Sequence, residues 1–312
     1  MSEYRIIRIN KSSVEHIKKL YYRCFKLRKS LNDISLKYDT SIFGLCDTGF
    51  LAFDQKNRPA AYYGVFPMIM SLDNKDYLVA QSGDTMTDPA HRGKGLFIEL
   101  AKETYNYIQE KKVQFVFGFP NRNSYPGFIK KLNWEFYGRM KDFKFNNKAF
   151  PICELVSKFW ILKPIYKKFC DIRLSKHRLE PNEEIVDKFN LSQSWGHVKK
   201  DLNYFKYKKY NTYLINYKDF IMLIKADSHL IVGDVAYFKN NDTEDFIHAV
   251  ECIAKQLGCK KTIISLNENH WLYSYLSLKY TPVESLPIGF LRFSNDLSFE
   301  KISFCGADYD TF

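Results

Sequence analysis

The stretch from Tyr77 to Lys111 restricts the fold of this chain more than any other segment. Its first part, Tyr77 to Thr87, has the pattern of a β-strand and ends at Asp88-Pro89. Its last part carries apolar residues at helical spacing and predicts a helix from Gly95 to about Lys111. A strand that leads through a short loop into a helix predicts a mixed α/β fold.

The loop between this strand and this helix has a composition suited to phosphate binding. It reads Arg92-Gly93-Lys94-Gly95 and is followed by Leu96. The first N–H groups of a helix have no partner within the helix, and the helix dipole adds positive charge there. Gly93 and Gly95 allow a phosphate to approach these N–H groups, and Arg92 and Lys94 add positive charge. The loop therefore predicts a pyrophosphate site, with an ordinary turn before a helix as the alternative.

Two other phosphate-binding loops do not match. A P-loop ends in Gly-Lys-Ser or Gly-Lys-Thr, whereas Gly-Leu-Phe follows Lys94. A dinucleotide-binding fingerprint has a third glycine where this chain has Ile98. The loop therefore belongs to neither of these two classes.

The rest of the first half supports the mixed α/β prediction. Strands are predicted at residues 4–9, 49–53, 60–70, 113–119 and 134–145, and helices at 12–24 and 124–133. The run from Val113 to Phe119 is apolar throughout, which is typical of a strand buried on both faces.

A basic segment follows the first half of the chain. Residues 153–176 have a helical pattern interrupted by Pro164, and seven basic residues stand between Pro151 and Arg178 against only Glu154 and Asp171. This composition favours contact with an anionic membrane surface or another polyanion. The alternative is a linker helix packed between two domains, whose basic side chains cover apolar contacts.

The second half repeats the order of the first half in weakened form. Gly83-Asp84 recurs as Gly233-Asp234, and Phe97-Ile98 recurs as Phe246-Ile247. We interpret this as two copies of one fold, with two unrelated α/β units as the alternative. The loop that corresponds to the glycine-rich one, residues 239–244, has two acids and no glycine, which opposes phosphate binding.

Length and composition limit the class of protein. With 312 residues and 46% hydrophobic content, the chain can form two domains with cores of normal size. Its net charge of +12 would attract nucleic acid, anionic lipid or phosphorylated ligands alike. Its seven cysteines show no disulfide or metal-binding spacing, so no metal is expected. Neither a membrane-spanning run nor a secretory signal is recognised, so a cytoplasmic location is expected.

The run from Thr87 to Leu96 resembles motif A of the GNAT N-acetyltransferase superfamily, in which a strand leads into an Arg/Gln-x-x-Gly-x-Gly/Ala loop. Arg92 and Gly95 match that pattern, whereas Phe97 replaces its final small residue and is expected to narrow or reshape the phosphate cradle. Residues 121–134 resemble motif B, the next strand-to-helix unit. As a whole, the chain resembles tandem-GNAT proteins of bacterial surface-polysaccharide or amino-sugar pathways.

This resemblance implies an α/β (α+β) fold with two GNAT-like domains in tandem, each a mixed, mostly antiparallel central sheet flanked by helices. The acyl-CoA-binding domain would span residues 1–148, a basic linker 149–184, and a degenerate second copy 185–312. That copy would contribute to the acceptor site or act as a scaffold. In the family the two central strands, here residues 77–87 and 113–119, splay apart and pantetheine lies in the gap.

The resemblance also implies which residues bind the cosubstrate, acetyl-CoA or another acyl-CoA. Main-chain groups near Met86 and Thr87 would contact pantetheine and the acyl carbonyl. The N–H groups of the loop, from Arg92 through Gly93, Lys94 and Gly95 to Leu96, would hold the pyrophosphate. Asn121 and Ser124 would lie beside the pantetheine arm.

Acyl transfer to an amine needs a neutral nucleophile, a polarised carbonyl and a proton for the departing thiolate. Asp84 is the candidate base because it lies on the strand that leads to the loop; a carboxylate held by structural hydrogen bonds is the alternative. Tyr125 is the candidate acid, although Ile129 stands where the family often has its tyrosine. His91 is expected to face the phosphates.

The sequence thus predicts an acyl-CoA-dependent N-acyltransferase for a small amine, with a nucleotide-linked amino sugar as the favoured acceptor. Aromatic and basic residues from Trp195 to Lys208 would suit such a sugar in a cleft between the copies, and an aromatic core stripe is the alternative. Nucleic acid is not expected as a partner. Two other functions stay open: a Fem-type aminoacyl-tRNA-dependent transferase, which the basic charge fits, and a GNAT-fold binding protein without turnover.

Overall fold

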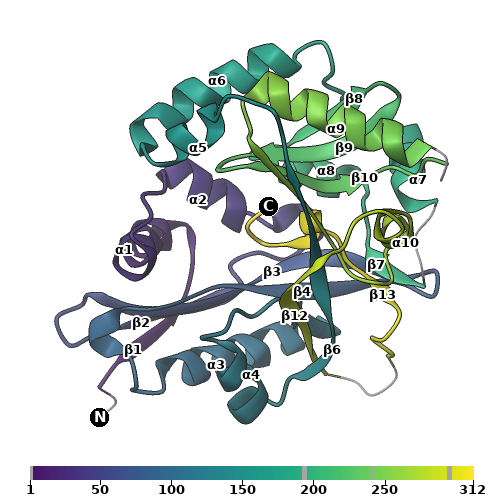
Figure 1. Ribbon diagram of the computed structural model, residues 1–312. Coiled ribbons are helices and arrows are strands. Elements are labelled where there is room, and N and C mark those ends of the chain that lie inside the picture. The colour runs from purple at the N-terminus through teal and green to yellow at the C-terminus, as the bar shows by residue number, and fades with distance from the viewer. Residues whose placement is uncertain (1–2, 192–194, 240–241, 294–296) are drawn as a thin grey trace. The chain divides into compact units, whose positions relative to one another are not determined.

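The computed structural model describes residues 3–191, 195–239, 242–293 and 297–312, without the side chain of Trp160 (Figure 1). The chain forms two compact units. The first unit comprises residues 1–137 and 287–300, and the second comprises residues 138–286 and 301–312. Each unit has a mostly antiparallel sheet flanked by helices, which confirms the predicted α/β (α+β) fold.

The sheet of the first unit begins with five strands that follow chain order, and β12 lies beside the fifth. Neighbouring strands are antiparallel, except that β4 and β5 are parallel. The strands are β1 (Arg5–Arg8), β2 (Gly49–Phe53), β3 (Pro59–Leu72), β4 (Lys75–Thr87), β5 (Phe115–Gly118) and the part of β12 (Val283–Arg292) from Gly289 to Arg292.

Helices cover both faces of this sheet (Figure 1). The helices α1 (Val14–Phe25) and α2 (Leu31–Tyr38) lie on one face, and α3 (Leu96–Glu110) and α4 (Tyr125–Leu132) lie on the other. Successive strand residues point to opposite faces. Accordingly, Leu51 and Tyr62 belong to the core under α1 and α2, whereas Ala52 and Tyr63 belong to the core under α3 and α4. Leu96, the first residue of α3, belongs to the second of these cores, and Met86 of β4 belongs to the first, so the loop connects two packed elements.

The sheet of the second unit has the order β6-β11-β10-β9-β8, and β10 and β11 are its parallel pair. Lys141 to Asn146 of β6 supply the strand beside β11. The strands of this unit are β6 (Glu135–Asn146), β7 (Gly196–Val198), β8 (Tyr213–Tyr217), β9 (Phe220–Ala226), β10 (Leu230–Val235), β11 (Lys261–Leu266) and β13 (Ile302–Ser303). Its helices are α5 (Ile152–Ser157), α6 (Lys163–Leu174), α7 (Glu183–Asn190), α8 (Leu202–Lys208), α9 (Thr243–Leu257) and α10 (Trp271–Ser277).

The same order of elements occurs in both units, but the last strand is exchanged. In each unit an antiparallel hairpin leads into a long helix, a parallel strand and a short helix. The strand that follows α4 pairs with β11 of the second unit, and the strand that follows α10 pairs with β5 of the first unit. The sequence pattern of a strand predicts that a strand forms, but it does not identify the strand with which it pairs. The exchange could therefore not be predicted from the sequence.

These pairings move the domain boundaries away from the predicted division at residues 148 and 184. Residues 287–300 belong to the first unit, where Gly289 to Arg292 pair with β5. Residues 149–184 belong to the second unit, where the Tyr166 hydroxyl donates to the carbonyl of Leu257, 2.9 Å away. The predicted interruption at Pro164 is confirmed, because α5 ends at Ser157 and a second helix, α6, begins at Lys163 with Pro164 in its first turn.

No helix among the described residues has both the length and the apolar character that crossing a bilayer requires.

Candidate functional site

The parallel strands β4 and β5 pair over only a short distance. The registered pairs are Ala80 with Val116 and Gln81 with Phe117. Beyond Gln81, β4 continues for six residues to Thr87, and these residues pair with β3 on their other side. One edge of β4 is therefore left open toward a gap at the end of β5. At the end of β5 the two strands are still adjacent, since a Cβ atom at Gly118 would lie 3.2 Å from the Cβ of Ser82, so the splay of the central strands stays a prediction.

The loop at the end of this open edge has the geometry of an anion site. Gly93 and Gly95 have φ of 78° and 79°, in the left-handed region that favours glycine. A Cβ atom added at either glycine would meet no atom within 4 Å. Among the described residues, no acceptor is hydrogen-bonded to the main-chain N–H groups of residues 92–97. Free N–H groups at a helix start beside open space fit the diphosphate of an acyl-CoA.

The basic side chains of the loop are exposed at its rim. Lys94 forms an ion pair with Glu3 and lies 5.6 Å from the ring centre of Tyr4. Arg92 donates from Nε to the carbonyl oxygen of Thr87, 3.4 Å away. Arg92 and Lys94 belong to the loop that carries the free N–H groups. Their charges therefore add to the positive potential of the helix start.

His91 and Phe97 have roles that differ from those predicted. The Nδ1 atom of His91 is 2.9 Å from the Tyr4 hydroxyl, and its Nε2 atom is 3.9 Å from the Asp54 carboxylate. The imidazole thus contacts the residue before β1 through Nδ1, and its Nε2 atom faces the Asp54 carboxylate, which follows β2. The ring of Phe97 packs on α4, where a Cβ atom at Gly127 would lie 2.6 Å from it. The absence of a side chain at Gly127 accommodates Phe97 away from the cradle.

Asp84 lies at a β-bulge of β4. Two residues, Asp84 and Thr85, oppose Tyr63 of β3, and Asp84 has a positive φ of 52°. Its Oδ2 atom is 2.8 Å from the ammonium of Lys37 and accepts hydrogen bonds from the hydroxyls of Tyr38, at 2.9 Å, and Tyr21.

Burial, with the Asp84 carboxylate nearby, raises the pKa of Tyr38, so this phenol stays a hydrogen-bond donor. The Lys37, Tyr21 and Tyr38 partners of Asp84 were not predicted. Their only signal in the sequence is that Tyr21 continues the apolar stripe of α1.

The other predicted site residues lie at the end of β4 and in the turn before α4. Met86 is buried and pairs with Tyr62, and Thr87 pairs with Ala61. The N–H of Asp88 donates to the carbonyl of Ala60, so Thr87 and Ala61 form a non-hydrogen-bonded pair. The main-chain groups of Thr87 therefore point to the open edge of β4, whereas those of Met86 face β3. The side chain of Asn121 accepts from the N–H groups of Asn123 and Ser124, at 2.9 and 3.2 Å. This turn leads into α4.

Tyr125 is the first residue of α4, and its ring centre lies 4.5 Å from that of Phe136. The phenol is part-buried, at the same end of α4 as the Asn121 turn.

A buried hydrogen-bond network supports the point where β4 and β5 separate. The Tyr63 hydroxyl is 2.8 Å from Ser82 Oγ and 2.7 Å from the Tyr105 hydroxyl, which also accepts from Trp134 Nε1 at 3.1 Å. Burial raises the pKa of both phenols, and hydrogen bonding by Trp134 opposes this at Tyr105. The network ties β3, β4 and α3 together next to the gap. It was not predicted, because two of its members read as ordinary core tyrosines.

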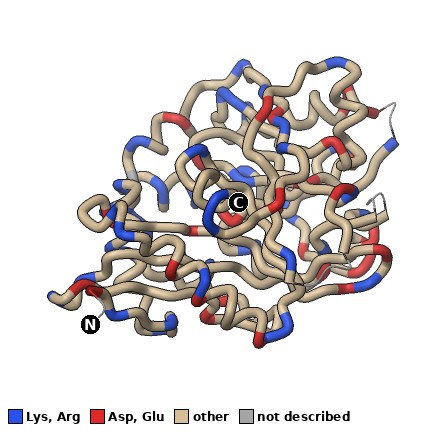
Figure 2. The backbone as a smooth tube through the Cα atoms, turned by 90° about the horizontal axis from the view of Figure 1, so that it is seen from below, with Lys and Arg blue, Asp and Glu red and all other residues tan. Residues whose placement is uncertain are grey.

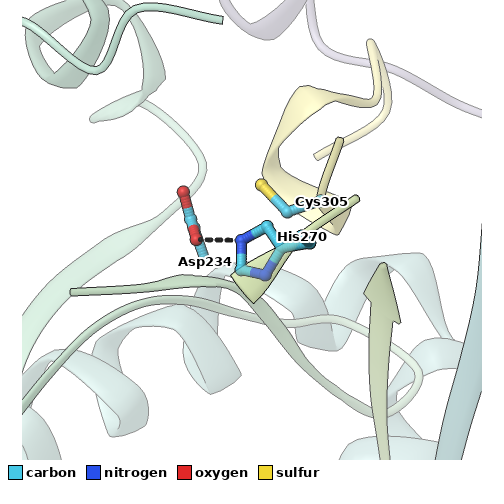
Figure 3. A group of neighbouring side chains, drawn as sticks. All are labelled: Asp234, His270 and Cys305. Carbon is cyan, nitrogen blue, oxygen red and sulfur yellow. Dashed lines mark hydrogen bonds and ion pairs between the residues drawn. The ribbon is translucent and has the colours of Figure 1, made fainter. Parts of the chain in front are cut away.

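Asp234, the counterpart of Asp84 in the repeat, lies in a buried polar cluster of the second unit (Figure 3). Its Oδ1 atom is 3.3 Å from His270 Nε2, and Cys305 lies close enough for the three side chains to share a metal ion. However, the ammonium of Lys200 is 3.5 Å from Asp234 and 2.7 Å from Asp308.

This buried cation supplies the positive charge that a metal would supply. Burial and the adjacent carboxylates raise the pKa of the Cys305 thiol, which opposes metal binding by sulfur. The cluster therefore fits an internal ion-pair network and not a metal site. Asp84 and Asp234 have similar surroundings. Each lies at or next to a β-bulge, and the carboxylate of each faces a lysine ammonium.

Four of the nine residues predicted as an acceptor platform are buried instead. Tyr204 and Phe205 are buried, and Tyr204 donates to the carbonyl of Ala307 at 2.8 Å. Lys200 and Lys208 are also buried, and Lys208 donates to the carbonyl of Tyr309 at 2.9 Å. The alternative of an aromatic core stripe is thus correct for Tyr204 and Phe205. That alternative placed the lysines outside the core, whereas Lys200 and Lys208 are buried.

The loop before α9 matches its predicted character as far as it is described. Asn240 and Asn241 lie outside the described residues. Glu244 and Asp245 occupy the first turn of α9, where negative charge opposes binding of an anion.

Positive charge is not confined to the loop before α3. Figure 2 shows basic and acidic residues interspersed along much of the backbone. The net charge of +12 is therefore a property of the whole chain, and the geometry of the loop is what distinguishes this site.

The open edge of β4, the glycine loop and the free N–H groups of α3 define a fold of the GNAT acyltransferase type in the first unit. The family model of the acetyltransferase (GNAT) domain matches residues 5–137. Residues 5–137 are therefore similar to the GNAT acetyltransferase domain. Among curated proteins, none matches the chain.

Solved structures share the fold over nearly the whole chain. A GCN5-related N-acetyltransferase from Sphaerobacter thermophilus is 11% identical, with a TM-score of 0.57 over 96% of this chain and 99% of that one. A GCN5-related N-acetyltransferase from Kribbella flavida is 12% identical, with a TM-score of 0.58 over 92% and 70%. N-myristoyltransferase from Saccharomyces cerevisiae with bound myristoyl-CoA is 10% identical, with a TM-score of 0.59 over 95% and 80%. At these identities the similarity is one of fold.

Proposed function

We propose that the first unit binds acyl-CoA and that the protein is an N-acyltransferase for a small amine. The observation that carries this proposal is the loop after β4, where unpaired N–H groups of residues 92–97 border the open edge of the strand. The match of residues 5–137 to the acetyltransferase family supports the same activity. The similarity to a myristoyl-CoA-bound fold supports a CoA thioester as donor.

Each part of the site has a proposed task. The N–H groups from Gly93 to Leu96 hold the diphosphate, with Arg92 and Lys94 at the rim. Main-chain groups near Met86 and Thr87 hold the pantetheine arm along the open edge of β4, with Asn121 and Ser124 beside it. The bound thioester supplies an activated acyl group, and the protein supplies orientation and proton transfer.

We assign the proton-transfer steps to Asp84 and Tyr125. Oδ2 of Asp84 is held by Lys37, Tyr21 and Tyr38, which orients the carboxylate. No partner of Oδ1 is found among the described residues, so this oxygen can accept a proton from the amine or from an intervening water. Tyr125 would donate to the leaving thiolate.

A finer proposal concerns the acceptor and the architecture. We propose a nucleotide-linked amino sugar as the amine, in a cytoplasmic step of surface-polysaccharide synthesis, and a tandem GNAT arrangement with a degenerate second copy. The net charge of +12 is compatible with a phosphorylated acceptor without selecting it, and the repeated order of elements supports the tandem.

Calorimetric titration with acetyl-CoA tests the donor site. The unmodified protein should bind, and Arg92→Glu should weaken binding by about 10- to 150-fold, because a charged hydrogen bond contributes about 1.5–3 kcal/mol. Lys102→Glu is the matched control, since Lys102 is exposed on the same helix but away from its start. Salt-sensitive binding of tRNA without binding of acetyl-CoA would overturn the proposal. An assay of acyl transfer to a panel of amines, in which the release of free CoA thiol is measured, then identifies the acceptor.

A further inference from the structure

The segment from Phe150 to Ile172 exposes several large apolar side chains side by side with basic ones. Ile161, Ile165 and Ile172 are 68, 66 and 65% exposed, and Phe159 is 58% exposed. Exposed basic residues alternate with them along α5, the following 3-10 turn (Trp160–Leu162) and α6: Lys158, Lys163, Lys167, Lys168 and Arg173. We call this set of residues the α5–α6 surface.

One face of helix α6 packs against the second unit, and the opposite face is exposed to solvent. Tyr166, Cys170 and Leu174 recur every four residues and are buried. The first of these bonds to Leu257 at the end of α9, and α6 lies beside α9 in Figure 1. Ile165 and Ile172 are seven residues apart, about two helical turns, so they share a face that lies away from this buried stripe. The isoleucines therefore do not contribute to the core of the unit.

The charge of the α5–α6 surface is positive with little internal compensation. Its two acids are engaged: Glu154 accepts from the N–H of Lys260 at 2.9 Å, and Asp171 pairs with Arg178 at 3.3 Å. Lys163 pairs with Asp227 at 2.9 Å. Lys158 and Lys168 have no ion-pair partner among the described residues. An anionic partner would therefore meet uncompensated ammonium groups between apolar side chains.

We propose that the α5–α6 surface binds the headgroup region of an anionic membrane. A helix that lies flat on a bilayer inserts apolar side chains into the acyl boundary and keeps lysines at the headgroups. Anionic lipids attract each nearby basic residue, which matches the free cations on this surface. The protein would thus be held at the membrane through its second unit.

Other partners fit these residues less well. Lysine is depleted in the cores of protein–protein interfaces, whereas it separates the isoleucines here. Nucleic acids are bound through phosphate contacts and stacking on aromatic rings, and exposed isoleucines serve neither contact. The proposal does not depend on acyl-CoA binding, because the α5–α6 surface belongs to the second unit.

Vesicle sedimentation of the full chain tests this proposal. We expect binding to phosphatidylcholine vesicles with about one-third phosphatidylserine at low salt, weak binding to pure phosphatidylcholine, and loss of binding at high salt. Lys158→Gln combined with Lys168→Gln should weaken binding by roughly 25-fold, or about fivefold for each charge removed. Ile165→Ser combined with Ile172→Ser should weaken it by about tenfold or more.

Matched controls lie elsewhere on the second unit. Leu191 and Leu278 are 73 and 75% exposed, so Leu191→Ser combined with Leu278→Ser removes similar apolar surface outside the α5–α6 surface. Lys206→Gln combined with Lys239→Gln removes two exposed lysines. Both controls should bind vesicles like the unmodified protein, and all variants should keep the same circular dichroism spectrum.

Three outcomes would overturn the proposal. One is no vesicle binding at low salt, and a second is equal loss of binding in the control variants. The third is binding of a single-stranded oligonucleotide, but not of vesicles, that depends on Lys158 and Lys168. Calorimetry with acetyl-CoA on the same preparations separates failure of this proposal from failure of the proposed activity.

Discussion

Replacement of Gly93 by alanine separates the two properties that the structure gives to this residue. One is its backbone conformation, with φ of 78°, and the other is the open space where a Cβ atom would stand. Gly44 has the same two properties, with φ of 85° and no atom within 4 Å of an added Cβ, but lies in the turn after η2 (Ser41–Phe43). Gly44→Ala is therefore a matched control for Gly93→Ala.

The magnitudes follow from these two properties. Neither alanine meets a neighbouring atom, so each variant should lose only the cost of a left-handed non-glycine residue, about 1–2 kcal/mol. At Gly93 the methyl group also occupies space from which a phosphate would approach the N–H groups. Loss of one charged hydrogen bond would weaken acetyl-CoA binding by about 10- to 150-fold, whereas Gly44→Ala should leave it unchanged.

Two measurements on each variant distinguish a loss of stability from a loss of acetyl-CoA binding. Urea denaturation without ligand gives the free energy of unfolding, and calorimetric titration gives the dissociation constant for acetyl-CoA. Equal loss of stability with a selective loss of binding in Gly93→Ala supports the site. Unchanged binding in Gly93→Ala would refute the placement of the diphosphate on this loop.

Two more predictions concern the bulge carboxylates. Asp84→Asn should lower kcat by more than about tenfold with the dissociation constant for acetyl-CoA unchanged, as expected for loss of a base, and unaltered kcat would reject that role. Burial alone would raise the pKa of Asp234, but Lys200 and His270 outweigh it and hold the pKa below its ordinary value. The stability from this carboxylate is then complete above about pH 4 and is lost as pH falls through the lower, folded-state pKa. Asp234→Asn should therefore show a smaller drop in unfolding free energy between neutral and acid pH than the unmodified protein; an equal drop would contradict the ion-pair network.

The alternative for Asp84, a carboxylate held by structural hydrogen bonds, receives support from its counterpart. Both bulge carboxylates face a lysine, although only the first unit has a glycine loop. Breaking a buried ion pair typically costs about 3–5 kcal/mol, so Asp84→Asn should also lower stability. Measuring kcat per folded molecule is therefore necessary to distinguish a base from a structural anion.

The sequence by itself determined the local elements of the site. Helix α3 was predicted from Gly95 to about Lys111 and spans Leu96–Glu110, and the strand predicted at 77–87 is β4. These predictions succeed because apolar period, helix starts and glycine conformations depend on neighbours in the chain. The free N–H groups before α3 follow from the same local rule.

Only the tertiary structure decided which distant residues meet. The exchange of β6 and β12 depends on strand pairing across more than a hundred residues, and no local pattern specifies a strand's neighbour. The direction of Phe97 depended on the missing side chain of Gly127, and the partners of Asp84 came from α1 and α2. Chain-local forces shape the loop, whereas packing between elements selects the contacts that surround it.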